Sequence, residues 1–273
     1  MASRILRVSL TITVSVLFFM PFYLTLVNIF KSLGQITANP LSLPAPFTLE
    51  NLTNVLTKPG NMLYDSLWNS LVITVVSVTV TVLSASMLSY YIAREDTKLT
   101  KGLLVFMLLG LMIPPQIILI PIVKVLQFFG IMHSMTGLIA FFIAYYIPFA
   151  TFLYTGFIKT VPRELDESAE MDGAKPMYLF WKVVFPLLGP CTASALIFLS
   201  VFIWNDFLNP LIIMGPLNGT TITTGIYQAM GQFSTNWGEM FALMMLASLP
   251  LLLLYLMLQK QFIDGLTAGS VKG

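Results

Sequence analysis

The chain has 273 residues, of which 57% are hydrophobic and only 10% are charged. Soluble globular proteins carry about 25% charged residues, so a water-soluble fold with so few charges could not cover its own surface. The formal net charge of +2 is too small to indicate a nucleic-acid partner. These numbers exclude an ordinary soluble domain and indicate an integral membrane protein whose apolar surface faces lipid.

Six apolar segments are long enough to cross a bilayer, which takes about 20 residues per helix. We expect spans over residues 8–30, 67–93, 102–129, 136–158, 187–213 and 239–262. The expected fold is all-α, with one polytopic membrane domain over 1–273 and six transmembrane helices. The first apolar run follows Arg4 and Arg7 as in a signal peptide, but it is longer and has no cleavage site, so we interpret it as a retained span.

Lysine and arginine fall mainly on one side of this arrangement. Eleven of the 14 are Arg4, Arg7, Arg94, Lys98, Lys101, Lys159, Arg163, Lys175, Lys182, Lys260 and Lys272. The opposite side holds Lys31, Lys58 and Lys124. Cytoplasmic loops are enriched in these residues, so we expect both termini and the loops 94–101 and 159–186 to be cytoplasmic.

Prolines interrupt the third expected span at Pro114, Pro115 and Pro121. Proline removes a backbone donor and kinks a helix, and in lipid the freed carbonyl needs another partner. Two interpretations remain open. The bend either serves packing alone, or it lies beside a translocation path to which Pro114 and Gln116 contribute.

The loop over 159–186 predicts a helix–turn–helix outside the membrane. Thr160 can cap a first helix, and Pro162 suits its first turn. Gly173 is a natural stop because it tolerates a left-handed backbone. Pro176 then starts a second short helix, which Pro186 ends.

The same loop offers two kinds of side chain to a neighbour. Its acidic residues Glu164, Asp166 and Glu167 lie in the first helical turn, and Tyr178, Phe180 and Trp181 are expected to form an aromatic face. An amphipathic loop resting on lipid is disfavoured, since the inner leaflet is negative. Carboxylates for acid–base catalysis are disfavoured, since nothing else catalytic lies nearby. A docking element for a cytoplasmic partner fits best.

The outer end of the fifth span carries Trp204, Asn205 and Asp206. These residues could line a polar vestibule, in which the indole stacks on a solute and the amide forms hydrogen bonds. They could equally form an interfacial aromatic anchor beside a solvated helix end. Both interpretations stay open from the sequence.

Enzyme motifs are missing from the chain. There is no H-E-x-x-H, no G-x-S-x-G and no phosphate-binding G-x-x-x-x-G-K-[ST], so we expect no enzyme, no metal site and no ATP bound by a P-loop. The lone Cys191 can form no internal disulfide. The alternative to an assisted permease is a stand-alone secondary transporter, which would need buried ionisable residues and usually an inverted repeat, and neither is evident.

One segment of the loop resembles a known family. The E-A-A loop of permease subunits in bacterial ATP-binding-cassette importers reads roughly E-A-A-x-x-D-G-A. Here the sequence is Glu167-Ser168-Ala169-Glu170-Met171-Asp172-Gly173-Ala174, followed by Phe185-Pro186. Only Ser168 departs from the pattern. The stretch Trp204-Asn205-Asp206-Phe207 and the tail over 264–273 are similar to the carbohydrate-uptake branch, of the type of the second maltose permease.

The resemblance implies that the loop forms coupling helices that dock on an ATPase subunit. The residues implied in that docking are Pro162, Glu167, Ala169, Asp172, Gly173, Phe180 and Pro186. The implied partners are a second homologous permease, a cytoplasmic ATPase dimer and an extracellular or periplasmic solute-binding protein.

The implied substrate is a carbohydrate, of disaccharide or oligosaccharide size, carried across the bacterial cytoplasmic membrane by alternating access. ATP and magnesium would bind the partner subunits and no cofactor would bind this chain.

Overall fold

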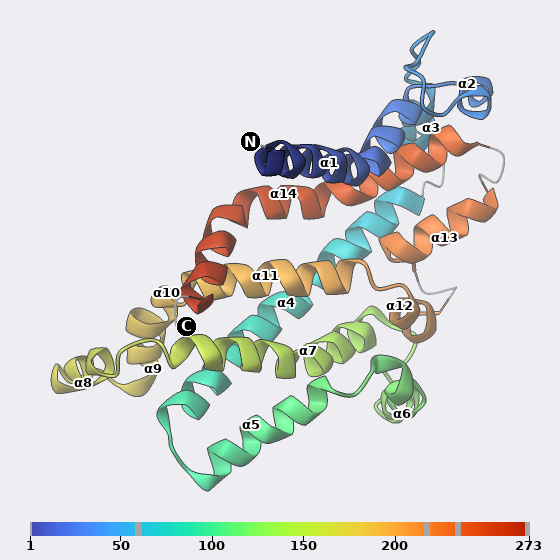
Figure 1. Cartoon of the computed structure of the whole chain (residues 1–273). Helices are drawn as coiled ribbons and strands as arrows, with labels where there is room; N and C mark the ends of the chain where they lie inside the picture. Colours follow the sequence, from blue (N-terminus) through green and yellow to red (C-terminus); the bar gives the residue numbers. More distant parts are fainter. Residues whose placement is uncertain (1, 58–61, 216–218, 233–235, 271–273) are drawn as a thin grey trace. The chain divides into compact units, whose positions relative to one another are not determined.

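The structure is a computed structural model that describes residues 2–57, 62–215, 219–232 and 236–270, with the side chains of residues 2–5, 62, 232 and 264–270 left aside. The elements are α1 (Ala2–Ile29), α2 (Leu33–Ala38), α3 (Glu50–Thr57), α4 (Met62–Arg94), α5 (Lys98–Leu111), α6 (Pro115–Phe128), α7 (Met135–Ile158), α8 (Glu164–Met171), α9 (Pro176–Leu179), the π-helical turn η1 (Phe180–Val184), α10 (Phe185–Leu187), α11 (Gly189–Trp204), α12 (Leu208–Ile213), α13 (Ile222–Gln232) and α14 (Trp237–Ser270). Every regular element in those ranges is helical, which confirms the all-α class (Figure 1).

Packing divides the chain into two compact units. Unit 1 holds Met1–Leu67 and Ile222–Pro250, and unit 2 holds Trp68–Thr221 and Leu251–Gly273. Two of the three unit boundaries fall inside α4 and α14, and the third lies at the start of α13. A single domain over the whole chain stays a prediction.

Among the described residues, four helices are long and apolar enough to cross a membrane, and the number rises to six if each of two bent helix pairs is one span. The four are Leu6–Ile29, Leu63–Arg94, Met135–Ile158 and Trp237–Ile263. The two pairs are Lys98–Leu111 with Pro115–Phe128, and Pro176–Leu187 with Gly189–Trp204. The polytopic membrane architecture predicted from composition is therefore confirmed.

The third expected span, 102–129, is two helices rather than one kinked helix. The axes of α5 and α6 are bent by 105°. Two successive prolines explain the break, because the residue before a proline avoids the helical region. Pro114 is accordingly extended, with φ −61° and ψ 137°, and Pro115 opens α6. The Tyr145 hydroxyl of α7 donates a hydrogen bond to the carbonyl oxygen of Ile113 at 3.4 Å, so the break has a polar partner.

The fifth expected span, 187–213, is also divided. Its helix α11 ends at Trp204, and α12 begins at Leu208. Sixteen residues of α11 span about 24 Å, somewhat less than the apolar thickness of about 30 Å. A continuous helix through 205–207 was expected and is wrong, because the Asp206 side chain starts a new helix there.

Helix α7 lies at the centre of unit 2. The Ser89 hydroxyl of α4 donates to the Thr151 carbonyl of α7 at 3.0 Å. The Tyr154 hydroxyl of α7 donates to the Thr192 hydroxyl of α11 at 2.9 Å. These bonds join buried polar groups between apolar helices, where a missing hydrogen bond would cost folding free energy.

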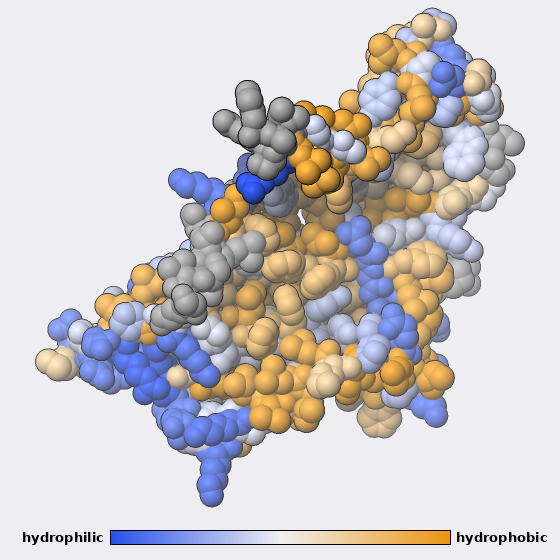
Figure 2. Space-filling view, in the orientation of Figure 1, coloured by the Kyte–Doolittle hydropathy of each residue, from blue (hydrophilic) through white to orange (hydrophobic). Residues whose placement is uncertain are grey.

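Figure 2 shows hydrophobic side chains over the helices and hydrophilic ones gathered over α8, α9 and the turn between α4 and α5.

Unit 1 contains a buried polar cluster at the end of α1. Lys31 is 0% exposed, and its Nζ donates to the carbonyl oxygens of Asn39 and Pro40 at 3.1 Å each. The Asn51 amide of α3 donates to the carbonyls of Ile29 and Lys31, at 2.8 and 2.7 Å. These bonds hold the segment after α1 against α3.

Candidate functional site

The docking loop, defined as residues 159–187, contains the expected helix–turn–helix but begins later than expected. Helix α8 starts at Glu164, with Arg163 at its N-cap. Thr160 does not cap it, because its hydroxyl donates to the Phe157 carbonyl at 2.7 Å and so closes the end of α7. Pro162 is exposed in the short connection between the two helices.

The turn after α8 gives a structural reason for several residues of the E-A-A pattern. Gly173 has φ +82°, a left-handed conformation that glycine adopts without strain. Its N–H donates to the Glu170 carbonyl at 2.9 Å, and the N–H of Ala174 donates to the Ala169 carbonyl at 3.0 Å. This pair of bonds is a Schellman motif, which also brings together the side chains on its two ends. Here those side chains are Ala169 and Ala174, and both pack against the core of unit 2.

Ser168 is the one departure from the family pattern, and its hydroxyl finds a hydrogen-bond partner within its own helix. The Ser168 hydroxyl donates to the Glu164 carbonyl one turn earlier, at 2.7 Å. A serine whose hydroxyl bonds its own helix fits where alanine would stand.

The second helix of the docking loop changes geometry before α11 begins. The N–H of Phe185 bonds the carbonyl of Phe180, five residues back, which makes the turn over Phe180–Val184 a π-helix. Pro186 follows and has no N–H to give to the carbonyl of Lys182. The chain then bends by 77° between Leu187 and Gly189, where α11 begins. The helix was predicted to end at Pro186, and it ends one residue later, at Leu187.

The residues expected to couple with an ATPase divide into exposed and buried groups. Pro162, Glu167, Asp172, Gly173 and Pro186 are exposed, and Ala169 is half-buried. Phe180 is only 3% exposed, so the expectation that it lies on an open aromatic face is wrong. Its position two residues after Tyr178 turns it to the other side of the helix, where it packs on Tyr90 with ring centroids 5.3 Å apart. Tyr178 is 60% exposed and keeps the outward position.

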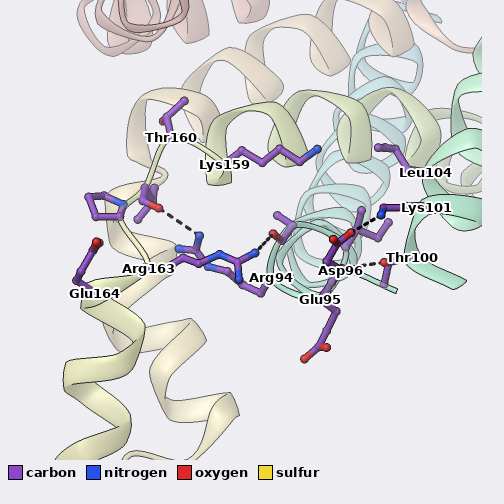
Figure 3. Close-up of a pocket in the computed structure, with 14 residues that line it drawn as sticks. Arg94, Glu95, Asp96, Thr100, Lys101, Leu104, Lys159, Thr160, Arg163 and Glu164 are labelled. Carbon is purple, nitrogen blue, oxygen red and sulfur yellow. Dashed lines mark hydrogen bonds and ion pairs between the residues drawn. The ribbon is translucent and has the colours of Figure 1, made fainter. Parts of the chain in front are cut away.

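A buried ion pair at the base of the loop escaped the sequence analysis. Asp166 was expected to be one of the exposed acids, but its carboxylate Oδ2 lies 2.5 Å from Nε of Arg94, the last residue of α4. The two side chains are 12% (Arg94) and 10% (Asp166) exposed. Arg94 also donates from Nη1 to the Val161 carbonyl at 3.2 Å, and Arg163 donates to the Ala93 carbonyl at 3.4 Å. Figure 3 shows these two arginines between the end of α4 and the start of the docking loop.

A second ion pair nearby is exposed. Nζ of Lys101 lies 2.7 Å from Oδ1 of Asp96, with side chains 68% and 75% exposed. The hydrogen bond from Lys101 lowers the pKa of Asp96, and the charges of Lys101, Arg163 and Lys159 lower it further. Asp96, Lys101 and Arg94 line a cavity of about 660 Å³ between the end of α4, the start of α5 and the end of α7 (Figure 3).

Two of the residues expected beside a translocation path, Asn205 and Asp206, have hydrogen-bond partners in the adjoining helices. Asp206 accepts from the Asn209 N–H at 3.2 Å and from the Asn209 side-chain amide at 2.5 Å, which starts α12. Trp204 is 5% exposed, and the Asn205 amide donates back to the Val201 carbonyl at 2.9 Å. Pro114 and Gln116 are exposed at the start of α6. These contacts account for a helix break, and the path itself stays a prediction.

Comparisons with known proteins agree on one family. The family model described as "Binding-protein-dependent transport system inner membrane component" matches residues 85–267. The chain is 34% identical to the melibiose/raffinose/stachyose import permease protein MelC of Bacillus subtilis, over 93% of this chain and 92% of that protein. It is 34% identical to the multiple sugar-binding transport system permease protein MsmG of Streptococcus mutans, over 94% and 93%.

An archaeal relative and a solved structure extend the likeness. The glucose import system permease protein GlcU of Saccharolobus solfataricus is 31% identical over 95% of this chain and 93% of its own. The fold matches a chain in the crystal structure of a bacterial ABC transporter involved in the import of the acidic polysaccharide alginate, with a TM-score of 0.84, 16% identity and 96% coverage of both chains.

Proposed function

The chain belongs to the family of inner-membrane components of binding-protein-dependent transport systems, and from this premise we propose that it carries a carbohydrate inward as one of two permeases of an ATP-driven importer. The family is one of transport permeases, so the chain is not expected to catalyse covalent chemistry. A stand-alone secondary transporter is not supported, since the family is that of binding-protein-dependent transport systems and the relatives are named as permease proteins of sugar import and transport systems.

The observation that carries the proposal is the docking loop. It holds two short helices around a glycine turn and exposes Glu167, Asp172 and Tyr178 together. A cavity of about 580 Å³ next to the turn is lined by Asp172, Lys175 and Tyr178, among others. Such a surface, acidic at one end and aromatic at the other, suits insertion into a groove of a folded partner. In our proposal the partner is a cytoplasmic ATPase dimer, which holds the ATP and magnesium.

The proposed cycle is alternating access. Closure of the ATPase dimer on ATP would move the docking loop, and the loop would shift the spans between an inward-open and an outward-open arrangement. A second homologous permease would supply the other half of the path, and an extracellular or periplasmic solute-binding protein would deliver the cargo. In the bacterial cytoplasmic membrane, this places both termini and the docking loop on the cytoplasmic side.

The cargo is proposed from the printed names of the relatives. MelC is named for melibiose, raffinose and stachyose, MsmG for multiple sugars and GlcU for glucose. A di- or oligosaccharide is our choice within that class. The proposed path residues are Pro114, Gln116, Trp204, Asn205 and Asp206.

The test is capture of partners from gently solubilised membranes through a tag on this chain. We expect an ATPase and a second permease to co-purify, and Glu167→Lys to reduce the ATPase captured because it reverses a charge on the docking surface. Glu50→Lys is the matched control, since Glu50 is an exposed acid in α3. A chain that purifies alone and still moves solute on an ion gradient would contradict the proposal.

A further inference from the structure

Arg94 joins three segments of unit 2 through one guanidinium group. Nε pairs with the Asp166 carboxylate in the first turn of α8 at 2.5 Å. Nη1 donates to the carbonyl oxygens of Val161 and Ile158, at 3.2 and 3.4 Å, where α7 ends. Arg94 itself is the last residue of α4. We call this set of contacts the Arg94 clamp.

The clamp is built from groups that are hard to separate. Both charged side chains are about nine-tenths buried, and removing one partner would leave a buried charge uncompensated. The flat guanidinium fork can serve a carboxylate and carbonyls at once, which lysine cannot. Asp166 also lies in the first turn of its helix, where a negative charge is favoured by the helix dipole.

An open space lies beside the ion pair, between α4 and the docking loop. A cavity of about 550 Å³ opens beside the ion pair and is lined by residues of α4 and of both docking-loop helices, including Arg94, Asp166 and Phe180. The ion pair connects α8 with α4 at the edge of this space.

The second helix of the docking loop is connected to the same point. The Arg94 guanidinium carbon lies 5.9 Å from the centroid of the Tyr90 ring, within range of a cation–π contact. Tyr90 in turn packs on Phe180 at 5.3 Å between centroids. Both helices of the docking loop therefore meet α4 at its last turn, one through charge and one through aromatic packing.

We propose that Arg94 is a positioning residue that makes the end of α4 move together with the docking loop, so that the ion pair with Asp166 passes motion from the loop into the membrane. This inference rests on the proposed function, in which an ATPase moves that loop. The proposed link between α4 and the docking loop is formed by Arg94 and Asp166, which lie outside the E-A-A pattern that begins at Glu167.

The experiment uses the full importer in proteoliposomes and measures solute taken up per ATP hydrolysed, together with the melting temperature of the purified complex. The variants are Arg94→Met, Asp166→Asn and the double variant Arg94→Met/Asp166→Leu. An apolar pair in place of a buried ion pair commonly preserves stability, so the double variant keeps the fold if a single variant loses it. We expect the double variant to melt near the wild type but to move roughly tenfold less solute per ATP.

The matched control breaks the exposed pair nearby with Asp96→Asn/Lys101→Gln, and we expect its uptake per ATP to equal that of the wild type. A double variant that is stable and fully coupled overturns the inference and leaves the pair a structural one. A control that uncouples as strongly also overturns it, because the buried pair would then have no special part. A wild-type chain that binds no ATPase at all overturns the proposed function and this inference with it.

Discussion

Asn51 of α3 lies against Gly238 of α14, at a place where a β-carbon on residue 238 would overlap the Asn51 amide group. The same amide donates to the carbonyls of Ile29 and Lys31 and holds the end of α1. One hydrogen atom in place of a methyl group at residue 238 thus permits the contact between α3 and α14 inside unit 1.

The first prediction is that Gly238→Ala destabilises the protein by about 1–3 kcal/mol, the range for overpacking a filled site. The physical reason is that the Asn51 amide must move away from the two carbonyls that it satisfies. The measurement is the thermal unfolding midpoint in detergent. Gly231→Ala is the control, since a β-carbon there meets nothing within 4 Å, and it should leave the midpoint unchanged or higher. Equal midpoints for the two variants would contradict the packing described.

The second prediction concerns the glycine turn of the docking loop. Gly173→Pro should uncouple transport while the chain remains in the membrane, because proline fixes φ near about −65° and removes the N–H that bonds the Glu170 carbonyl. Gly173→Asn should retain most activity, since asparagine tolerates the left-handed conformation. Uptake and membrane abundance are measured for both. Surviving uptake in the proline variant would remove the docking loop from the mechanism.

The third prediction separates the two interpretations of Asp206. Asp206→Ala should lower solute uptake while assembly survives, because the start of α12 loses an acceptor worth about 1 kcal/mol. Asp206→Asn keeps an acceptor oxygen for the Asn209 N–H and loses the charge. We expect the Asn variant to take up solute like the wild type if the cap is what matters. Loss of uptake in both variants, with normal abundance, would instead assign the charge to the translocation path.

The fourth prediction is a pH dependence centred on Lys31. Burial lowers the pKa of Lys31 below its ordinary value of 10.5. Between the lowered pKa and 10.5 the unfolded chain binds more protons than the folded chain, so the contribution of this group to stability rises with pH.

The measurement is the difference in melting midpoint between the wild type and Lys31→Met, followed from about pH 8 to about pH 10. The difference should shift in favour of the wild type as pH rises. The control is Lys124→Met, at a lysine of α6 that is exposed and so lacks the burial on which the prediction depends. A difference for Lys31→Met that falls with pH would show that burial does not control this amine.

Much of the fold could be predicted because lipid leaves few choices. Long apolar runs must be helices, and Gly173 must end one. The two broken segments were harder to predict. The Pro114–Pro115 pair indicated a bend but not its size. The signal for the break near Asp206 was present, since an Asn-Asp pair before Pro210 is typical of a helix start, but neither the vestibule nor the interfacial anchor predicts a new helix there.

The candidate site was only partly predictable, since its key contact is long-range. Arg94 and Asp166 lie far apart in the sequence, and each has an ordinary alternative as a helix-end charge. Only the packing of α4 beside α8 brings them together. Phe180 shows the same limit. An aromatic residue in a short amphipathic helix faces either a partner or the core of its own protein, and its position within the helical turn decides which.

The π-helical turn Phe180–Val184 makes the direction of the docking loop depend on the number of residues in it. Such a turn closes its hydrogen bond over one residue more than an α-helical turn. The wider turn holds its extra residue without rotating the helix on either side, so loss of a single residue there would let the turn relax to α geometry and leave Tyr178 facing as before. A further residue inserted before the turn would instead rotate everything ahead of it by about 100° relative to α11, and Tyr178 would face another direction with its chemistry unchanged. The number of residues between Gly173 and Pro186, as much as their identity, therefore decides where the loop points.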